Sequence, residues 1–207
     1  MVRLQDSWPE IKKGLKAQGK RLASYRSTIP AGRSGKWSVR KIKVKLDLEN
    51  LRMIRDGRGC APGEFTQLYC DGRGTVMSDT DAEIEDMRDF IDVATGRIFV
   101  CGLGLGCLVQ NLLRKEPVEY ITVVEISPDV ISLVAPHITS DRLAIVEGDA
   151  FRHVISKGTR YDFAWYDIWD NICSDNLKEA AELRRRFRGK VGKSFVWAEN
   201  EMRHPRY

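Results

Sequence analysis

The spacing of hydrophobic residues changes along the chain and separates two kinds of structure. From residue 78 onward, short apolar runs alternate with segments of helical spacing. The runs predict strands at 97–101, 119–125, 142–148, 161–167 and 194–199. The other segments predict helices at 80–94, at 108–113, at 128–134, around 150–156 and at 176–188. This βαβ alternation predicts an α/β fold, a Rossmann-like parallel sheet with helices on both faces.

Local signals support two of these helix starts. Thr80 and Glu83 have the spacing of a capping box, in which each side chain bonds a free N–H group of the first turn. Ser127 followed by Pro128 supplies an N-cap and a proline suited to the first helical position.

Before residue 78 the pattern predicts a small helix and short antiparallel strands. Helical spacing covers 8–26, a Gly/Pro/Ser turn cluster follows at 28–37, and apolar residues alternate with charged ones over 37–51. Shorter strands are expected at 65–70 and 74–78. We therefore expect a basic N-terminal helix and small β region at 1–77 and an α/β domain at 78–207.

The net charge of +5 is distributed unevenly. Residues 1–46 hold 13 Lys and Arg residues against two acidic ones, Asp6 and Glu10. Such a segment is suited to contact with nucleic acid or another anionic partner. The alternative is an amphipathic arm that packs on its own domain or on a second subunit of a homodimer.

Other aspects of the composition exclude several classes of protein. Five cysteines without a C-x-x-C pair, together with three histidines, give no zinc-ligand spacing, and we predict no metal site. No apolar stretch approaches the ~20 residues that span a bilayer, and the first residues lack the pattern of a secretory signal. A reducing, cytoplasmic location is expected.

Three glycines at alternate positions follow the strand at 97–101. Gly102, Gly104 and Gly106, with Leu103 and Leu105 between them, join that strand to the next helix. A strand, glycine loop and helix in this order are typical of a nucleotide site, although a tight turn without a ligand has the same pattern. Because a dinucleotide loop has the spacing G-x-G-x-x-G, these glycines argue against NAD and FAD.

Acidic residues end the next two strands. Glu125, followed by Ile126, lies where a carboxylate can accept hydrogen bonds from both ribose hydroxyls of an adenosine. Asp149 in the sequence EGDAF can accept from an adenine amino group, with Ala150 and Phe151 beside the ring. Asp149 is equally suited to cap the segment that follows it.

Aromatic and acidic residues gather after the strand at 161–167. Asp167 and Asp170 are flanked by Tyr166 and Trp169. Two carboxylates beside an aromatic wall suit a cationic or amine-bearing acceptor, and an ordinary turn at the strand end is the competing interpretation.

Together, GLGLG, Glu125, GDAF and DIWD resemble the class I S-adenosylmethionine-binding fold, and their spacing is most similar to its spermidine synthase branch. The resemblance covers residues 75–171. It implies that the glycine loop, Leu103 and Leu105 included, holds the methionine-like tail, that Glu125 with Ile126 holds the ribose, and that Asp149 with Ala150 holds the adenine. It further implies that Asp167, beside the cofactor, and Asp170 position and deprotonate an attacking amine.

One position departs from that branch. Where its glycine loop carries an aspartate that binds the propylamine of decarboxylated S-adenosylmethionine, this chain has Leu105. We therefore place an S-adenosylmethionine-dependent methyltransferase of unidentified acceptor first and an aminopropyltransferase second. A non-catalytic nucleoside-binding domain is the third hypothesis. Only eight residues follow 199, so we expect a class I sheet that is shortened at its C-terminal end.

Overall fold

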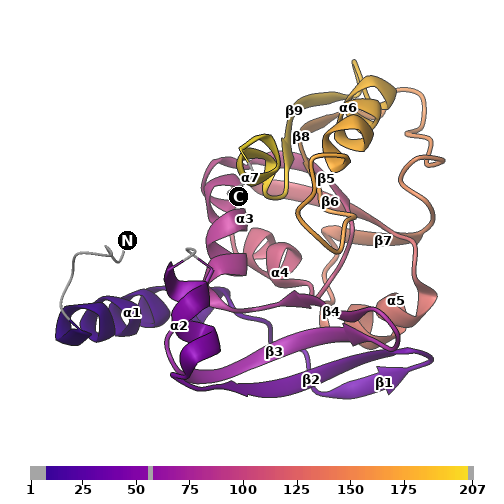
Figure 1. The fold of residues 1–207 in the computed structure, drawn as a ribbon. Helices are drawn as coiled ribbons and strands as arrows, with labels where there is room; N and C mark the ends of the chain where they lie inside the picture. The colour runs from indigo at the N-terminus through magenta and orange to yellow at the C-terminus, as the bar shows by residue number, and fades with distance from the viewer. Residues whose placement is uncertain (1–7, 56–57, 205–207) are drawn as a thin grey trace.

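The computed structural model describes residues 8–55 and 58–204, which form two β-sheets and the helices packed on them (Figure 1). The helices are α1 (Trp8–Leu22), α2 (Leu48–Arg55), α3 (Asp81–Val93), α4 (Cys107–Leu113), α5 (Pro128–Val134), α6 (Asn176–Arg186) and α7 (Glu199–Arg203), with 3-10 turns at Ala23–Tyr25 and Ala135–His137. In this described part, no helix has the length and apolarity that a membrane crossing requires.

The larger sheet is parallel and has five strands. They are β5 (Gly96–Cys101), β6 (Val118–Glu125), β7 (Leu143–Glu147), β8 (Tyr161–Tyr166) and β9 (Val191–Val196). Their order across the sheet is β7-β6-β5-β8-β9, and every neighbouring pair is parallel. The chain thus moves outward from β5 in one direction and then returns to its other side at β8. This topology confirms the Rossmann-like α/β fold.

Helices cover both faces of the parallel sheet. On one face, Ile98 and Val100 of β5 belong to a core that includes residues of α3, α4 and α5. On the other face, Phe99 and Cys101 belong to a second core with residues of α6. Because both faces of β5 are buried, its sequence is a continuous apolar run and not an alternating one.

The smaller sheet is antiparallel. Its strands are β1 (Gly32–Ser34), β2 (Trp37–Val44), β3 (Gly63–Cys70) and β4 (Gly74–Ser78), in that order. Trp37 and Leu68 share the same core as α3 and α4, and the Ser34 hydroxyl donates to the Asp129 carboxylate of α5 at 2.8 Å. In Figure 1 this sheet lies beside α4 and α5. Apolar packing therefore joins it to the parallel-sheet part of the chain.

Several of the 13 basic residues of segment 1–46 form ion pairs within the chain itself. The pairs are Arg21–Glu85, Arg26–Asp81, Arg33–Asp71 and Lys43–Glu64. The Arg26–Asp81 pair, at 2.9 Å, has a fully buried carboxylate and ties the end of the first helical segment to α3. These contacts favour the interpretation that the arm packs on its own chain. Residues 1–7 of the arm lie outside the described part.

Two predicted elements are wrong in kind. The strand expected over 37–51 ends at Val44, and its last part belongs to α2. The signal for this helix is Asp47, whose carboxylate accepts from the backbone N–H of Asn50 at 2.9 Å, as an N-cap does. No helix forms around 150–156. Instead, Asp149 closes a single turn by accepting from the N–H of Phe151 at 2.8 Å.

The last part of the chain also differs from the prediction. β9 covers Val191–Val196 where a strand at 194–199 was expected, and α7 was not predicted. Trp197 makes the last bond between β9 and β8, from its N–H to the carbonyl of Tyr166, and the extended backbone then ends at Ala198, which has a left-handed conformation with φ of 48°. The predicted N-cap at Ser127 is confirmed, since its hydroxyl accepts from Val130. The capping box is not formed, because Thr80 makes no side-chain cap bond to α3.

Gly102 is required by the close approach of two strand ends. Its φ is +96°, and a Cβ built there would lie 1.9 Å from the carbonyl oxygen of Asp167.

We expect Gly102→Ala to lower the free energy of unfolding by about 3 kcal/mol, as measured by urea denaturation. Gly158→Ala is the control, because φ there is +86° and no atom lies within 4 Å. Gly158→Ala should lower the free energy of unfolding by about 1 kcal/mol. Equal losses in both variants would contradict the steric argument.

Candidate functional site

A cavity of about 360 Å³ lies at the carboxyl ends of β5, β6 and β8. The ends of β5 and β8 are adjacent where the strand order reverses, which is where open α/β sheets bind ligands. The smaller sheet contributes Trp37, Leu68, Arg73, Val76 and Met77 to the lining. Helix α3 and the end of β9 complete the walls with Glu83, Met87 and Trp197.

Most of the residues predicted from the sequence line this one cavity. They are Gly102, Leu103, Gly104, Glu125, Ile126, Asp149, Ala150, Asp167, Trp169 and Asp170. Three predicted residues, Leu105, Gly106 and Tyr166, are not among its lining residues.

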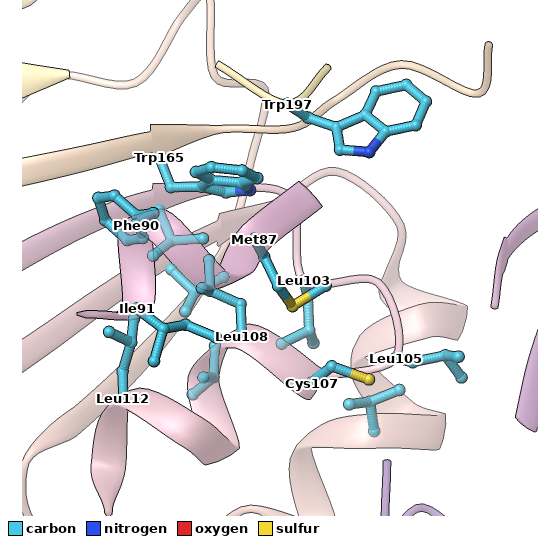
Figure 2. Close-up of a cluster of buried hydrophobic side chains, with 14 of the residues drawn as sticks. Met87, Phe90, Ile91, Leu103, Leu105, Cys107, Leu108, Leu112, Trp165 and Trp197 are labelled. Atoms are coloured by element: carbon cyan, nitrogen blue, oxygen red, sulfur yellow. The ribbon is translucent and has the colours of Figure 1, made fainter. Parts of the chain in front are cut away.

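Leu105 is buried in the core and does not reach the cavity. Its side chain is fully buried, and its carbonyl oxygen accepts from the Ser27 hydroxyl at 3.0 Å. Figure 2 shows Leu105 beyond Cys107, apart from Trp165 and Trp197. Leu105 is therefore a core residue that packs near the N-terminal segment. Its side chain does not determine which cofactor tail the cavity accepts.

Gly106 and Tyr166 also have packing roles. A Cβ at Gly106 would lie 2.3 Å from the side chain of Ile138, so glycine lets α4 approach the turn after α5. Tyr166 is fully buried on the opposite face of the sheet, where its ring lies 6.1 Å from that of Phe187. Tyr166 therefore does not shape the acceptor pocket as predicted, because a residue one position before Asp167 points to the other side of the strand.

Four of the five N–H groups of the glycine loop, all but that of Gly104, are already used within the protein. Those of Gly102 and Gly106 donate to the carbonyls of Val124 and Leu103, at 2.8 and 2.9 Å. Leu103 donates to Glu125, and the N–H of Leu105 points to the sulfur of Met77 at 3.3 Å. A loop that binds a pyrophosphate needs several free N–H groups. The geometry thus agrees with the sequence argument against a dinucleotide.

Glu125 joins two loops at the cavity wall. One carboxylate oxygen accepts from the N–H of Leu103 and the other from that of Ser127, each at 2.8 Å. The side chain is nearly buried but still lines the cavity. Since a carboxylate has about four acceptor positions, Glu125 retains acceptor capacity for a ligand hydroxyl while holding both loops.

Apolar and acidic groups lie beyond Glu125 along the same edge of the sheet. Ile126 leaves 69% of its surface exposed, although it borders the cavity. Asp149 uses one oxygen to close the turn at Phe151, and its other oxygen lies 3.6 Å from the Arg152 guanidinium. Both expected uses of Asp149 are therefore compatible, because it caps a turn and still borders the cavity.

Tryptophans and carboxylates dominate the rest of the wall. Trp37, Trp165, Trp169 and Trp197 all line the cavity, and the sequence analysis identified only Trp169 among them. Glu83 was also missed, because its spacing from Thr80 assigned it to a capping box. Burial raises the pKa of Glu83 to about 7, and the Arg58 charge opposes this effect. Burial, and next the negative charge of Glu83, raise the pKa of Asp167 to about 8.

The other two acidic groups near Asp167 have partners. Asp170 forms an ion pair with Arg73, which lies in the turn between β3 and β4. Glu179 of α6 accepts from the indole N–H of Trp169 at 2.6 Å. Asp170 therefore joins the smaller sheet to the loop after β8, and Asp167 is the member of the D-x-x-D pair for which no ion pair is formed among the described residues.

Within residues 8–55 and 58–204, no group of three or more His, Cys, Asp or Glu side chains has the arrangement of a metal site.

Comparison with known proteins gives partial matches. No protein-family model matches the sequence. The chain is 32% identical to polyamine aminopropyltransferase 2 of Hyperthermus butylicus over 36% of this chain and 27% of that protein, so the match spans about a quarter of the relative's length. Among solved structures it is similar to the CcbJ methyltransferase of Streptomyces caelestis, with 18% identity, a TM-score of 0.41 and coverage of 54% of this chain and 47% of that one.

A second solved structure is an S-adenosylmethionine-dependent methyltransferase of Mesorhizobium loti. It has 14% identity and a TM-score of 0.40 over 51% of this chain and 49% of that one. The relatives thus include methyltransferases and an aminopropyltransferase, the two groups that the sequence motifs resemble.

The raised pKa values of Glu83 and Asp167 make stability depend on pH. The folded chain keeps these protons at pH values where the unfolded chain has lost them. The stability that they contribute is fully present below about pH 4 and is lost as pH rises through about 7 and 8. We expect urea denaturation to show a lower free energy of unfolding at pH 9 than at pH 6.

In Asp167→Asn, this difference between pH 6 and pH 9 should shrink, because the amide does not ionise. Asp89→Asn is the control on α3, since Asp89 is exposed. The assignment fails if Asp167→Asn keeps the full pH dependence of the wild-type chain.

Proposed function

We propose that this protein is a transferase, an S-adenosylmethionine-dependent methyltransferase that acts on a small amine acceptor. The observation that carries the proposal is that one cavity at the sheet's switch point contains the glycine loop, Glu125 and Asp149 at one end and an acidic, tryptophan-rich wall at the other. The first end suits a nucleoside and the second suits a cation.

The nucleoside end would be held by residues of three strand ends. Glu125 would accept from the ribose hydroxyls with the acceptor positions that Leu103 and Ser127 leave open. Asp149 would accept from the adenine amino group, and the exposed surface of Ile126 would cover the ring. The cofactor's sulfonium supplies an electrophilic carbon, and the loop at Gly102 and Gly104 borders the space for its tail.

Asp167 is the residue that we assign to orienting the acceptor. Its carbonyl oxygen lies against Gly102, so its carboxyl is fixed beside the glycine loop. Trp165 and Trp169 line the same space, and aromatic faces attract alkylammonium groups. Asp170 is assigned a structural role in place of the catalytic one predicted, because its charge is paired with Arg73.

Aminopropyl transfer is the second candidate, and a specific observation favours it. Arg73 is the single Lys or Arg among the described residues that line the cavity, and it is paired with Asp170. The α-carboxylate of S-adenosylmethionine would have to compete for that guanidinium, whereas decarboxylated S-adenosylmethionine would not. The 32% identity to an aminopropyltransferase points the same way.

Three expectations lie outside this site and stay predictions. They are contact between segment 1–46 and nucleic acid, association into a homodimer, and a cytoplasmic location. A non-catalytic nucleoside-binding role also remains as an outcome of the binding experiments.

Calorimetry with 5′-methylthioadenosine tests the nucleoside end, because this compound lacks the amino-acid tail. Asp149→Ala should weaken its binding by about 1–3 kcal/mol, or roughly 5- to 150-fold, through loss of a hydrogen bond. Asp141→Ala, at an exposed position, should bind as the wild type does. No binding of either methylthioadenosine or S-adenosylmethionine by the folded wild-type chain would contradict both transferase proposals.

The cofactor tail is tested at Arg73. If intact S-adenosylmethionine is the cofactor, Arg73→Met should weaken its binding about tenfold, the effect of losing a charge-assisted bond of ~1.4 kcal/mol, and leave methylthioadenosine unchanged. Arg33→Met is the control, because Arg33 pairs with Asp71 and does not line the cavity. Tighter binding and turnover of decarboxylated S-adenosylmethionine by the wild type would place aminopropyl transfer first.

A further inference from the structure

Glu83 lies in the first turn of α3 and lines the cavity together with Asp167. Its nearest cation is Arg58, whose Nη2 is 3.9 Å from Glu83 Oε1. The same guanidinium makes contacts of 2.9 and 2.7 Å with the two carboxylate oxygens of Asp86. Among the residues described, none donates a hydrogen bond to the Glu83 carboxylate, so it is open to a ligand in the cavity.

A hydrogen-bond network holds this part of α3 in place. Asp86 accepts from Arg58 and also from the indole N–H of Trp197, at 3.2 Å. The loop after α2, helix α3 and the end of β9 are thereby joined one turn away from Glu83. Because Asp86 engages Arg58 at shorter distances, the negative charge of Glu83 is only partly neutralised.

The charged surroundings of Glu83 are mostly acidic. Arg58 faces it from the loop after α2 and Asp86 from its own helix, and Asp167 faces it from the end of β8. Behind these groups, Glu125 acts on Asp167, and Glu201 of α7 acts on Asp86 and Arg58. A site with this charge balance stabilises a cation placed between Glu83 and Asp167.

We propose that Glu83 is a second catalytic residue of this site, one that binds the acceptor's ammonium group and takes its proton. This inference rests on the proposed function. It explains why a carboxylate to which no described residue donates a hydrogen bond lies in the acidic, tryptophan-rich wall of the cavity.

In the proposed step a proton moves from the acceptor nitrogen to the Glu83 carboxylate. An N–H bond of the acceptor ammonium breaks, its electron pair stays on nitrogen as the nucleophilic lone pair, and the proton forms an O–H bond with Glu83. Asp167, which keeps its own proton more strongly, orients the amine. Glu83 then releases the proton to solvent and regains its charge. Burial raises the pKa of Glu83 to about 7. A carboxylate with this pKa is effective as a base near neutral pH.

Carboxyl titration of the ligand-free protein by carbon NMR tests the pair without any cofactor. The pKa of Asp167 should fall in Glu83→Gln, because a neighbouring negative charge is removed. Glu85→Gln is the matched control on the same helix, since Glu85 is paired with Arg21 and Arg88 and does not line the cavity. An unchanged Asp167 titration in Glu83→Gln would overturn the inference.

Binding of n-butylammonium, followed by NMR shifts with 1-butanol as the neutral comparison, tests the ammonium contact. Between pH 6 and 8 the wild-type affinity should rise about tenfold, as Glu83 ionises with its pKa near 7. Glu83→Gln should bind at least tenfold more weakly than the wild type at pH 8. Its affinity should rise less between pH 6 and 8, because only Asp167 still ionises there, and Glu83→Asp should keep the wild-type rise. Equal affinity in wild type and Glu83→Gln contradicts the inference.

The transferase function and the catalytic role of Glu83 are tested by different measurements. Absence of methylthioadenosine binding in the wild type counts against the transferase, while the Asp167 titration still decides the coupling to Glu83. Normal methylthioadenosine binding in Glu83→Gln is expected, because Glu83 lies on the acceptor side, and its loss would show a structural role instead of a catalytic one.

Discussion

The hydrogen bonds of Glu125 hold the ligand-facing edge of this protein together. Its two oxygens accept from Leu103 and Ser127, so one carboxylate fixes the glycine loop and the turn into α5. Gly102 then lies directly against the carbonyl of Asp167, which sets the end of β8 relative to the loop. These contacts set the glycine loop, the turn into α5 and the end of β8 relative to one another, and the N–H groups of Gly102, Leu103, Leu105 and Gly106 are used within the protein. A nucleoside that needs carboxylate acceptors fits this edge better than a phosphate does.

The smaller sheet completes the site and is not an appendage. Its Trp37 and Leu68 share a core with α3 and α4, and Arg73 reaches across to Asp170. Without this sheet the cavity that Asp167 lines would lack one wall. Removal of water is the main reason that the pKa of Asp167 is high. The antiparallel part therefore helps to enclose residues that belong to the parallel sheet.

Carboxylates that are partly removed from water and weakly paired destabilise a fold, and two of them, Glu83 and Asp167, lie beside four tryptophans in this cavity. The chain pairs other acids near the cavity, Asp86 with Arg58 and Asp170 with Arg73, but leaves Glu83 and Asp167 without such partners at short distance. A cationic acceptor would supply the missing positive charge. The raised pKa values of Glu83 and Asp167 thus bear both on the dependence of stability on pH and on the proposed binding of a cation.

The sequence by itself determined the parallel sheet, its helices and most of the cavity residues, because apolar runs and strand-end acids such as Glu125, Asp149 and Asp167 are local patterns. Tertiary structure alone decided which of the predicted residues reach the ligand space. Leu105 and Tyr166 are turned into the core by packing and by strand alternation, which no local motif reveals. Glu83, Trp37 and Trp197 enter the site from distant segments, and only the docking of the smaller sheet and of α3 brings them to the cavity.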